Sequence, residues 1–377
     1  MIPIEAVFDA YININILLVL VFGFWCLTRK LLKPLGMAHA YTTQLRLLNG
    51  MFLVIALSPV FVLIFNYLSK SSIIAPPFSL NLSDMIVAQY LQGNIDVKPA
   101  RLEEYLGLRS SLTHDLLGLS SGLGLLIVSL FVSGIVLFTM RFIRSVYLLR
   151  KIIRSSHVWR RFGNLQLLVS NTVSIPFTTR SLNNRYIVVP SSMLTNPENL
   201  KIALGHEFQH IRQFDLEWEI GLELLRPLFF WNPVYYLWKQ LVEQLRELSC
   251  DQRVLARSGF DPKTYCECLL QVCENSLEKN RLFRVTRPNV ALVKMDNWLQ
   301  GRSSAYLLRR RINSLLDENV VKLPKSVFPM VMILFVAIVA VSTLVLQKPD
   351  DWSQDRIMLS TIVNLERLTV RNVALSQ

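Results

Sequence analysis

The residues with the clearest chemical potential are two histidines four positions apart, with a glutamate directly after the first. They belong to the run Leu204-Gly205-His206-Glu207-Phe208-Gln209-His210, which has the pattern H-E-x-x-H. On a helix, positions i and i+4 lie on one face, so His206 and His210 can place both imidazoles on one metal ion. Glu207 could take a proton from a water that the metal has acidified. The pattern therefore predicts metal-assisted hydrolysis of a peptide bond.

The segment before this pattern predicts the helix that such chemistry requires. Asn196 can act as N-cap with Pro197 at the first helical position, while Thr195 and Glu198 also have the spacing of a capping box. Apolar residues then recur at helical intervals, without an interrupting proline, as far as His210. We therefore expect a helix that begins at Asn196 or one residue away from it and carries both histidines.

A catalytic zinc ion needs a third protein ligand and an open position, and a second predicted helix offers both a ligand and its support. The best ligand candidate is Glu247, and Asp251 follows it by four residues. Asp251 could accept a hydrogen bond from a ligand imidazole and so fix its tautomer. Glu243 is the rival ligand on the same face, and Cys250 is a softer candidate. The alternative is a helix pair with surface histidines and ordinary ion pairs.

The chain also carries four long apolar stretches. Hydrophobic residues make up 52% of the 377 residues, and the mean hydropathy is +0.37. The stretches without a charged residue are Ala10–Thr28, Leu47–Ser69, Leu116–Met140 and Ser326–Gln347. Each is long enough to cross a bilayer core as a helix. The first lacks the basic start and the cleavage site of a signal peptide, so we expect it to be retained.

Charge predicts how these spans are oriented. The connection after the first span is basic with no acid, and the segment between Arg141 and Lys325 contains 28 basic and 16 acidic residues. The positive-inside rule places both on the cytoplasmic side, so both termini are expected outside. With a net charge of +13, the protein is expected to contact anionic membrane lipids through its basic residues. No direct nucleic-acid binding is expected, because no motif for it is visible.

The expected fold is an α-helical membrane protein with an α+β cytoplasmic domain. Its segments are residues 1–46 (first span and cytoplasmic loop), 47–115 (second span and extracytoplasmic loop), 116–140 (third span), 141–325 (cytoplasmic peptidase domain), 326–347 (fourth span) and 348–377 (short extracytoplasmic tail). Amphipathic pieces are expected at Leu82–Leu91 and Arg101–Leu108 of the extracytoplasmic loop. The stretch Ile220–Val242 contains charges and two prolines, so it favours an interfacial helix pair over a fifth span.

The start of the cytoplasmic domain predicts one helix and two strands. Phe142–Arg161 is expected to be a basic helix, and Leu165–Ser170 and Tyr186–Val189 are expected to be strands. The second strand ends shortly before the histidine helix, so it is our candidate for binding a substrate backbone by β-augmentation. The residues proposed for this edge strand are Arg185, Tyr186, Ile187, Val188 and Val189. An ordinary sheet strand is the equally weighted alternative.

Several motifs together resemble the BlaR/MecR-type membrane metallopeptidases, which transmit bacterial β-lactam signals. His206–His210, Trp231-Asn232-Pro233 and Glu247–Asp251 stand in the order seen in that family. So do Ser174-Ile175-Pro176-Phe177 and Tyr186–Pro190 upstream. The four spans, with the peptidase between the third and the fourth, are also similar, so the resemblance covers essentially the whole chain.

The resemblance implies a gluzincin-like site with one zinc ion per chain. His206, His210 and Glu247 would bind the metal, and Glu207 would be the general base. The protein would lie in the bacterial cytoplasmic membrane and cleave itself, a BlaI/MecI-like repressor or both, in an antibiotic response. It could act as a homodimer or with a partner sensor protein. Self-cleavage would fall in the cytoplasmic domain, within Leu277–Arg311.

One departure from the family concerns the sensor. The β-lactam sensors carry a penicillin-binding domain after the fourth span, whereas residues 348–377 contain no S-x-x-K. We therefore expect the signal to enter through the outer loop, the tail or a partner. Two other functions stay open, namely a quality-control or processing protease of membrane proteins and a non-catalytic receptor or scaffold with a structural zinc site.

Overall fold

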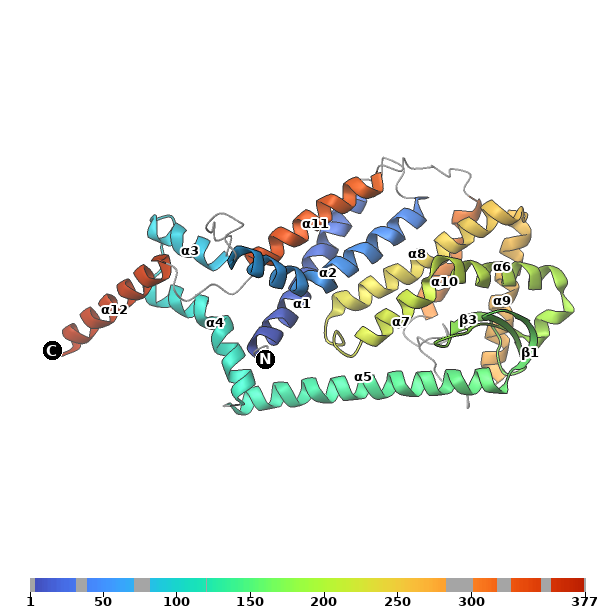
Figure 1. Ribbon diagram of the computed structural model, residues 1–377, viewed down its shortest axis with the longest axis horizontal. Helices are drawn as coiled ribbons and strands as arrows, with labels where there is room; N and C mark the ends of the chain where they lie inside the picture. Colours follow the sequence, from blue (N-terminus) through green and yellow to red (C-terminus); the bar gives the residue numbers. More distant parts are fainter. Residues whose placement is uncertain are drawn as a thin grey trace. The chain divides into compact units, whose positions relative to one another are not determined.

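The described part of the chain is mostly helical, with one four-stranded sheet (Figure 1). The computed structural model describes residues 4–31, 39–70, 82–119, 121–282, 301–316, 327–346 and 354–375. It divides into two compact units. Unit 1 consists of residues 1–25, 50–132 and 328–377, and unit 2 of residues 26–49 and 133–327. Each unit combines segments that are distant in sequence.

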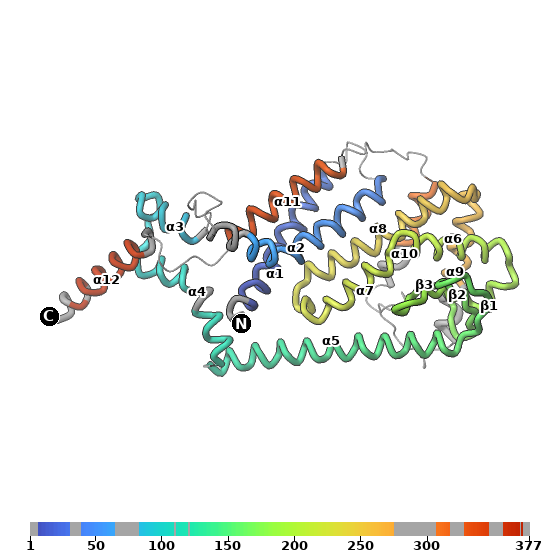
Figure 2. The backbone as a smooth tube through the Cα atoms, in the orientation of Figure 1, coloured from blue at the N-terminus to red at the C-terminus, as the bar shows by residue number. Residues whose placement is uncertain are grey.

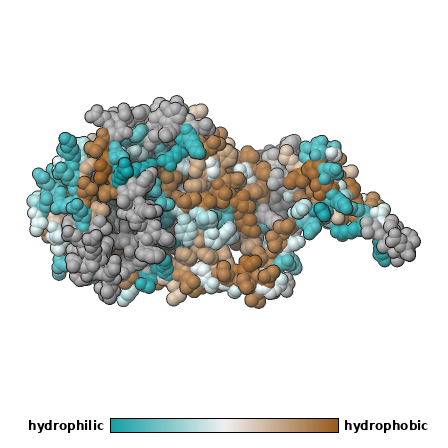
Figure 3. Space-filling view, turned by 180° about the vertical axis from the view of Figure 1, so that it is seen from behind, coloured by the Kyte–Doolittle hydropathy of each residue, from teal (hydrophilic) through white to brown (hydrophobic). Residues whose placement is uncertain are grey.

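Four helices of the described chain are long and apolar enough to cross a membrane. They are α1 (Ile4–Leu31), α2 (Tyr41–Lys70), α5 (Gly122–Ser155) and α11 (Val327–Val345). Apolar side chains cover much of the surface that these helices expose (Figure 3), as lipid contact requires. The four predicted apolar stretches coincide with these helices, except that α5 begins six residues later than expected.

The late start of α5 has a local cause. The preceding helix α4 (Pro99–Gly118) ends at Leu119, which adopts a left-handed conformation with φ of 48°. The hydroxyl of Ser121 then accepts a hydrogen bond from the Gly124 backbone N–H at 2.9 Å and caps the new helix. From Gly122 the helix continues without interruption for 34 residues, as the tube in Figure 2 shows.

The segment after the fourth apolar helix is itself helical and packed. Helix α12 (Gln354–Leu375) contacts both α3 (Leu82–Leu91) and α4. The buried residues of this small core are Val87, Leu102, Leu359 and Val363. An exposed ion pair joins Arg367 to Glu103 at 2.9 Å. Helices of the predicted outer loop and of the predicted tail thus pack together in one small core.

Unit 2 contains the sheet. Its strands are β1 (His157–Phe162), β2 (Leu165–Ser170), β3 (Phe177–Arg180) and β4 (Arg185–Pro190), in the order β1-β2-β4-β3. The β2–β4 pair is parallel, and the two outer pairs are antiparallel. Both predicted strands are confirmed as β2 and β4. The predicted helix over Phe142–Arg161 is wrong at its end, because Val158, Trp159 and Phe162 favour a strand and lie in β1, which pairs with β2.

The order of the strands corrects the predicted substrate strand. In β4, Tyr186 is paired with Gln166 of β2 on one side and with Thr179 of β3 on the other. The backbone hydrogen bonds of such an interior strand are already used within the sheet. The prediction that Arg185, Tyr186, Ile187, Val188 and Val189 form an edge strand is therefore wrong. The edge strand on this side of the sheet is β3.

Helices cover both faces of the sheet. On one face, Leu149 near the end of α5 packs with Leu168 and Val188. On the other, Ala203 of α6 (Pro197–Gln213) packs with Ile187. A strand buried on both faces is apolar throughout, which explains the continuous Ile187–Val189 run. The sheet thereby fixes α6, which lies against it (Figure 1). This helix carries both histidines.

The histidine helix begins as predicted. The Asn196 side chain accepts a hydrogen bond from the Asn199 backbone N–H at 3.3 Å, and Pro197 occupies the first turn. The next elements are α7 (Asp215–Leu225) and α8 (Pro233–Ser258), and α8 repeats this start with Asn232 and Pro233. Unit 2 also contains the 3-10 turn η3 (Ser191–Thr195), α9 (Pro262–Leu282) and α10 (Gly301–Leu316).

Candidate metal centre

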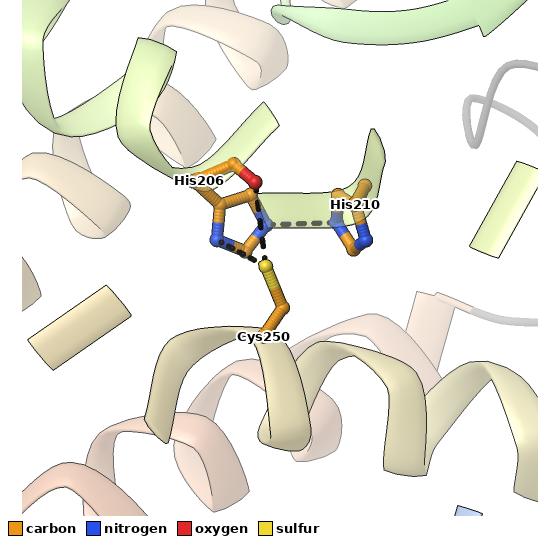
Figure 4. Close-up of side chains that lie close together, drawn as sticks. All are labelled: His206, His210 and Cys250. Atoms are coloured by element: carbon orange, nitrogen blue, oxygen red, sulfur yellow. Dashed lines mark hydrogen bonds between the residues drawn. The ribbon is translucent and has the colours of Figure 1, made fainter. Parts of the chain in front are cut away.

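Helices α6 and α8 bring the three predicted ligands together. The Nε2 atoms of His206 and His210 lie 3.2 Å apart (Figure 4). Glu247 approaches both, with Oε2 3.5 Å from Nε2 of His206 and Oε1 3.6 Å from Nε2 of His210. Tetrahedral ligands at zinc distances are separated by about 3.3 Å. The three side chains therefore already have the spacing of a metal site.

The other ring nitrogens show which atoms face the site. Nδ1 of His210 lies 2.8 Å from Oδ2 of Asp215, and Nδ1 of His206 lies 2.9 Å from the Tyr265 hydroxyl and 3.2 Å from Oδ1 of Asp251. A carboxylate only accepts hydrogen bonds, so we infer that each Nδ1 carries the proton. Both Nε2 lone pairs then face each other. Two acceptors at this distance need a cation or a proton between them, which fits a metal.

Asp251 is the anchor of the His206 side of the centre. Its side chain is fully buried, at 0% exposure. It accepts hydrogen bonds from the Tyr265 hydroxyl at 2.8 Å and from two nitrogens of Arg311 at 2.7 Å. Burial raises the pKa of Asp251, but the charge of Arg311 and the hydrogen bonds outweigh this and hold that pKa below its ordinary value. The carboxylate is therefore ionised and oriented.

Glu207 points to the edge strand. It is 7% exposed, and its Oε2 accepts a hydrogen bond of 2.5 Å from the hydroxyl of Thr178 in β3. The same hydroxyl lies 3.1 Å from the backbone oxygen of Glu207. The predicted general base on the histidine helix is thus held against β3.

The two rival ligands lie in poorer positions. Glu243 is 3.6 Å from the Lys239 ammonium. Cys250 Sγ is 3.5 Å from Nδ1 of His206 and 3.3 Å from its backbone oxygen (Figure 4), whereas Glu247 approaches Nε2 of that ring. His206, His210 and Cys250 could also hold a metal ion, but their ligand atoms spread over up to 4.8 Å. Glu247 lies closer to both Nε2 atoms, at 3.5 and 3.6 Å, through its two carboxylate oxygens.

Four residues around the centre were missed from the sequence. Asp215 could have been found, because it is an acid five residues after His210 in the first turn of the next helix. Thr178 lies on a short strand that was not predicted. Tyr265 and Arg311 come from α9 and α10, and no spacing relates them to the histidines.

The charges around the histidines predict how metal binding responds to pH. Burial lowers the pKa of His206 and His210, but Cys250 and the buried aspartates Asp251 and Asp215 outweigh it and raise both pKa values above the ordinary one. At neutral pH, protons therefore compete with the metal, and binding must release them.

We expect the apparent metal affinity to increase between pH 6 and pH 8, by roughly tenfold per pH unit for each proton released. Calorimetric titrations in buffers of different ionisation enthalpy measure the number of protons. A pH-independent affinity without proton release would contradict the raised pKa values of the two histidines.

Comparison with known proteins places the chain in a family. No curated protein matches it. The family described as BlaR1 peptidase M56 matches residues 6–292, a stretch that contains His206, Glu207, His210, Glu247 and Asp251. That family implies a membrane-associated metallopeptidase, in agreement with four apolar helices and a candidate metal centre. Because the match covers far more than half of its length, the chain belongs to the BlaR1 peptidase M56 family.

Proposed function

We propose that this protein is a gluzincin-like zinc endopeptidase of the bacterial cytoplasmic membrane. It acts on the cytoplasmic side in signal transduction, by regulated cleavage of itself, of a BlaI/MecI-like repressor or of both. The observation that carries the proposal is the approach of two Nε2 lone pairs and the Glu247 carboxylate to within 3.2–3.6 Å of one another. Two imidazoles and one carboxylate form a ligand set that suits zinc and leaves a coordination position open.

The surrounding side chains have defined parts in hydrolysis. A bound zinc ion would polarise the scissile carbonyl and acidify the attacking water. Glu207 takes the proton from that water and later delivers it to the leaving amide nitrogen. The Thr178 hydroxyl, bonded to Oε2 of Glu207, fixes the orientation of the carboxylate and leaves its other oxygen for the proton. Asp215 and Asp251 keep the two imidazoles turned with Nε2 inward.

We assign substrate binding to β3. Among the described strands, none pairs with the outer edge of β3, so an extended peptide can add there by main-chain hydrogen bonds. Thr178 belongs to this strand and touches Glu207, so a peptide on β3 passes the general base. Arg185 of β4 forms an ion pair with Glu217 of α7 at 3.2 Å, so we do not assign it to substrate binding.

The grouping of segments supports the proposed topology. The loop after α1 and the start of α2 share unit 2 with the metal centre, and Thr42 and Ser249 are hydrogen-bonded through their hydroxyls at 2.8 Å. Both this loop and the segment after Arg141 are basic, which favours the cytoplasmic side. The packed α3, α4 and α12 then lie outside together with both termini.

Self-cleavage is proposed to fall within Leu277–Arg311. Of the predicted region Leu277–Arg311, residues 283–300 lie outside the described residues. The parts on either side are the end of α9 and the beginning of α10. The family membership also supports a repressor substrate and either a homodimer or a partner sensor protein that brings the inducing signal.

Metal removal tests the proposed function. The full-length protein is purified with a co-encoded repressor, stripped with a chelator and reloaded with zinc. We expect cleavage to stop on stripping and to return at about one zinc ion per chain, with one defined cut in the chain or the repressor. Fragments of many unrelated membrane proteins would favour quality control. A chain that binds zinc but cleaves nothing in the presence of the inducer would contradict the peptidase assignment.

A further inference from the structure

We infer that Arg311 is a positioning residue of the metal centre, one that sets the geometry of Glu247 and Asp251 together. This inference depends on the proposed zinc site. Arg311 lies on α10, after residue 292, where the family match ends. It therefore belongs to a part of the chain to which the family comparison assigns no function.

The contacts of Arg311 divide its guanidinium between two carboxylates of α8. Nε donates to Oδ2 of Asp251 and Nη2 donates to Oδ1, both at 2.7 Å. Nη1 lies 3.1 Å from Oε2 of Glu247. All three nitrogens are thus engaged on residues that are one helical turn apart. The planar guanidinium, with its fixed donors, suits this double contact, whereas a lysine ammonium is a single point charge on a flexible stem.

Through these contacts Arg311 reaches two of the three proposed ligands. It touches the ligand Glu247 directly. It reaches His206 through Asp251, whose Oδ1 lies 3.2 Å from Nδ1 of that histidine. The ion pair engages only Oε2 of Glu247, so the carboxylate keeps lone pairs for a metal. Arg311 therefore fixes the plane of one ligand and the carboxylate that orients another.

Arg311 and its two carboxylate partners are mostly buried, which strengthens their contacts. The side chain of Asp251 is 0% exposed, and those of Glu247 and Arg311 are 14% and 17% exposed. Water therefore contributes little to holding the two carboxylates. Without the guanidinium, Glu247 would lose its ion-pair partner, and Asp251 would keep, among the described contacts, only the Tyr265 hydroxyl and His206. Two negative carboxylates one turn apart in a poorly solvated site would then be held less firmly.

The neighbouring arginines provide a matched control. Arg309, Arg310 and Arg311 are consecutive on α10 and carry the same charge. Arg310 donates to Gln244 at 3.0 Å, and Arg309 is exposed. Neither contacts Glu247 or Asp251 in the described contacts. Removing Arg309 therefore removes the same charge from the same helix without touching the carboxylates.

The test measures metal binding by the full-length protein in lipid nanodiscs. Zinc affinity is determined by competition with a chromophoric chelator for the wild type, Arg311→Ala, Arg311→Lys and Arg309→Ala. We expect Arg311→Ala to weaken zinc binding by roughly 10–100-fold, the effect of losing a partner that orients metal ligands. Arg311→Lys should recover only part of the loss, and Arg309→Ala should bind as the wild type does.

A second readout separates positioning from folding. Cobalt replaces zinc, and its visible absorption spectrum at saturating metal reports the ligand geometry. We expect a changed spectrum for both Arg311 variants and an unchanged one for Arg309→Ala. If Arg311→Ala does not fold, as judged by circular dichroism, Arg311→Lys carries the test by itself.

The outcomes are distinct. Wild-type affinity and spectrum in the folded Arg311 variants would overturn the role of Arg311 and leave the peptidase proposal standing. A wild-type chain that binds neither zinc nor cobalt would instead overturn the zinc site, and the inference about Arg311 with it.

Discussion

Glu207→Gln is expected to reduce peptide cleavage by roughly 10²–10⁴-fold, the usual contribution of a general base. Glutamine keeps the shape of the side chain, and its oxygen can still accept the hydrogen bond that Thr178 donates to Glu207. It cannot take a proton from water. Because Glu207 is not among the proposed ligands, the variant should keep its zinc. Cleavage is followed by immunoblotting and zinc by elemental analysis.

The matched control for this variant is Glu198→Gln. Glu198 lies in the first turn of the same helix and is exposed, so its replacement makes the same chemical change away from the site. It should cleave at the wild-type rate. Retained cleavage in Glu207→Gln would show that another group is the base. Loss of zinc in that variant would show that Glu207 acts on the metal itself.

Asp251→Asn is expected to lower both the free energy of unfolding and the zinc affinity, and this is the second large effect. The change leaves the guanidinium of Arg311 without its double carboxylate contact. The new amide N–H₂ group is itself a donor and would face the N–H donors of Arg311 or the hydroxyl donor of Tyr265. Removing one partner of a buried ion pair costs about 3–5 kcal/mol of stability. Because Arg311 is partly exposed, we expect a loss of about 3 kcal/mol here. Zinc affinity should fall by roughly 10–100-fold, because His206 loses its orienting partner.

Denaturant or thermal unfolding of the full-length protein in detergent measures the stability change. Glu267→Gln is the control, since Glu267 is an exposed carboxylate on α9. The double variant Asp251→Asn, Arg311→Met should recover part of the loss, because the guanidinium is no longer left without its buried Asp251 partner. An Asp251→Asn protein that unfolds like the wild type would contradict the central place of this carboxylate.

The parts of the structure that depend on local sequence could be predicted. The helix of His206 and His210 begins at Asn196 because an N-cap and a following proline act within one turn. The four apolar helices follow from length and composition. The approach of Glu247 to both histidines agrees with helical spacing and with the family resemblance.

The parts of the structure that depend on long-range pairing could not be predicted from the sequence. Nothing in the order of β2, β3 and β4 along the chain shows that β4 is inserted between the other two, so β4 was mistaken for an edge strand. The four-residue strand β3 carries two threonines and an arginine, too weak a pattern to detect. Arg311 lies sixty residues beyond Asp251, and only the folded chain joins them.

Because Arg311 lies on α10, zinc binding is coupled to the docking of α10 on α8. Coupling between two equilibria is reciprocal, so if the docked α10 tightens zinc binding by a given factor, zinc tightens the docking of α10 by the same factor. A factor of 10–100 corresponds to about 1.4–2.7 kcal/mol. Since α10 leads along the chain into α11, a force that draws α10 away from α8 works against the bound metal. Slower hydrogen exchange of the α10 amides in the zinc-loaded protein would measure this coupling.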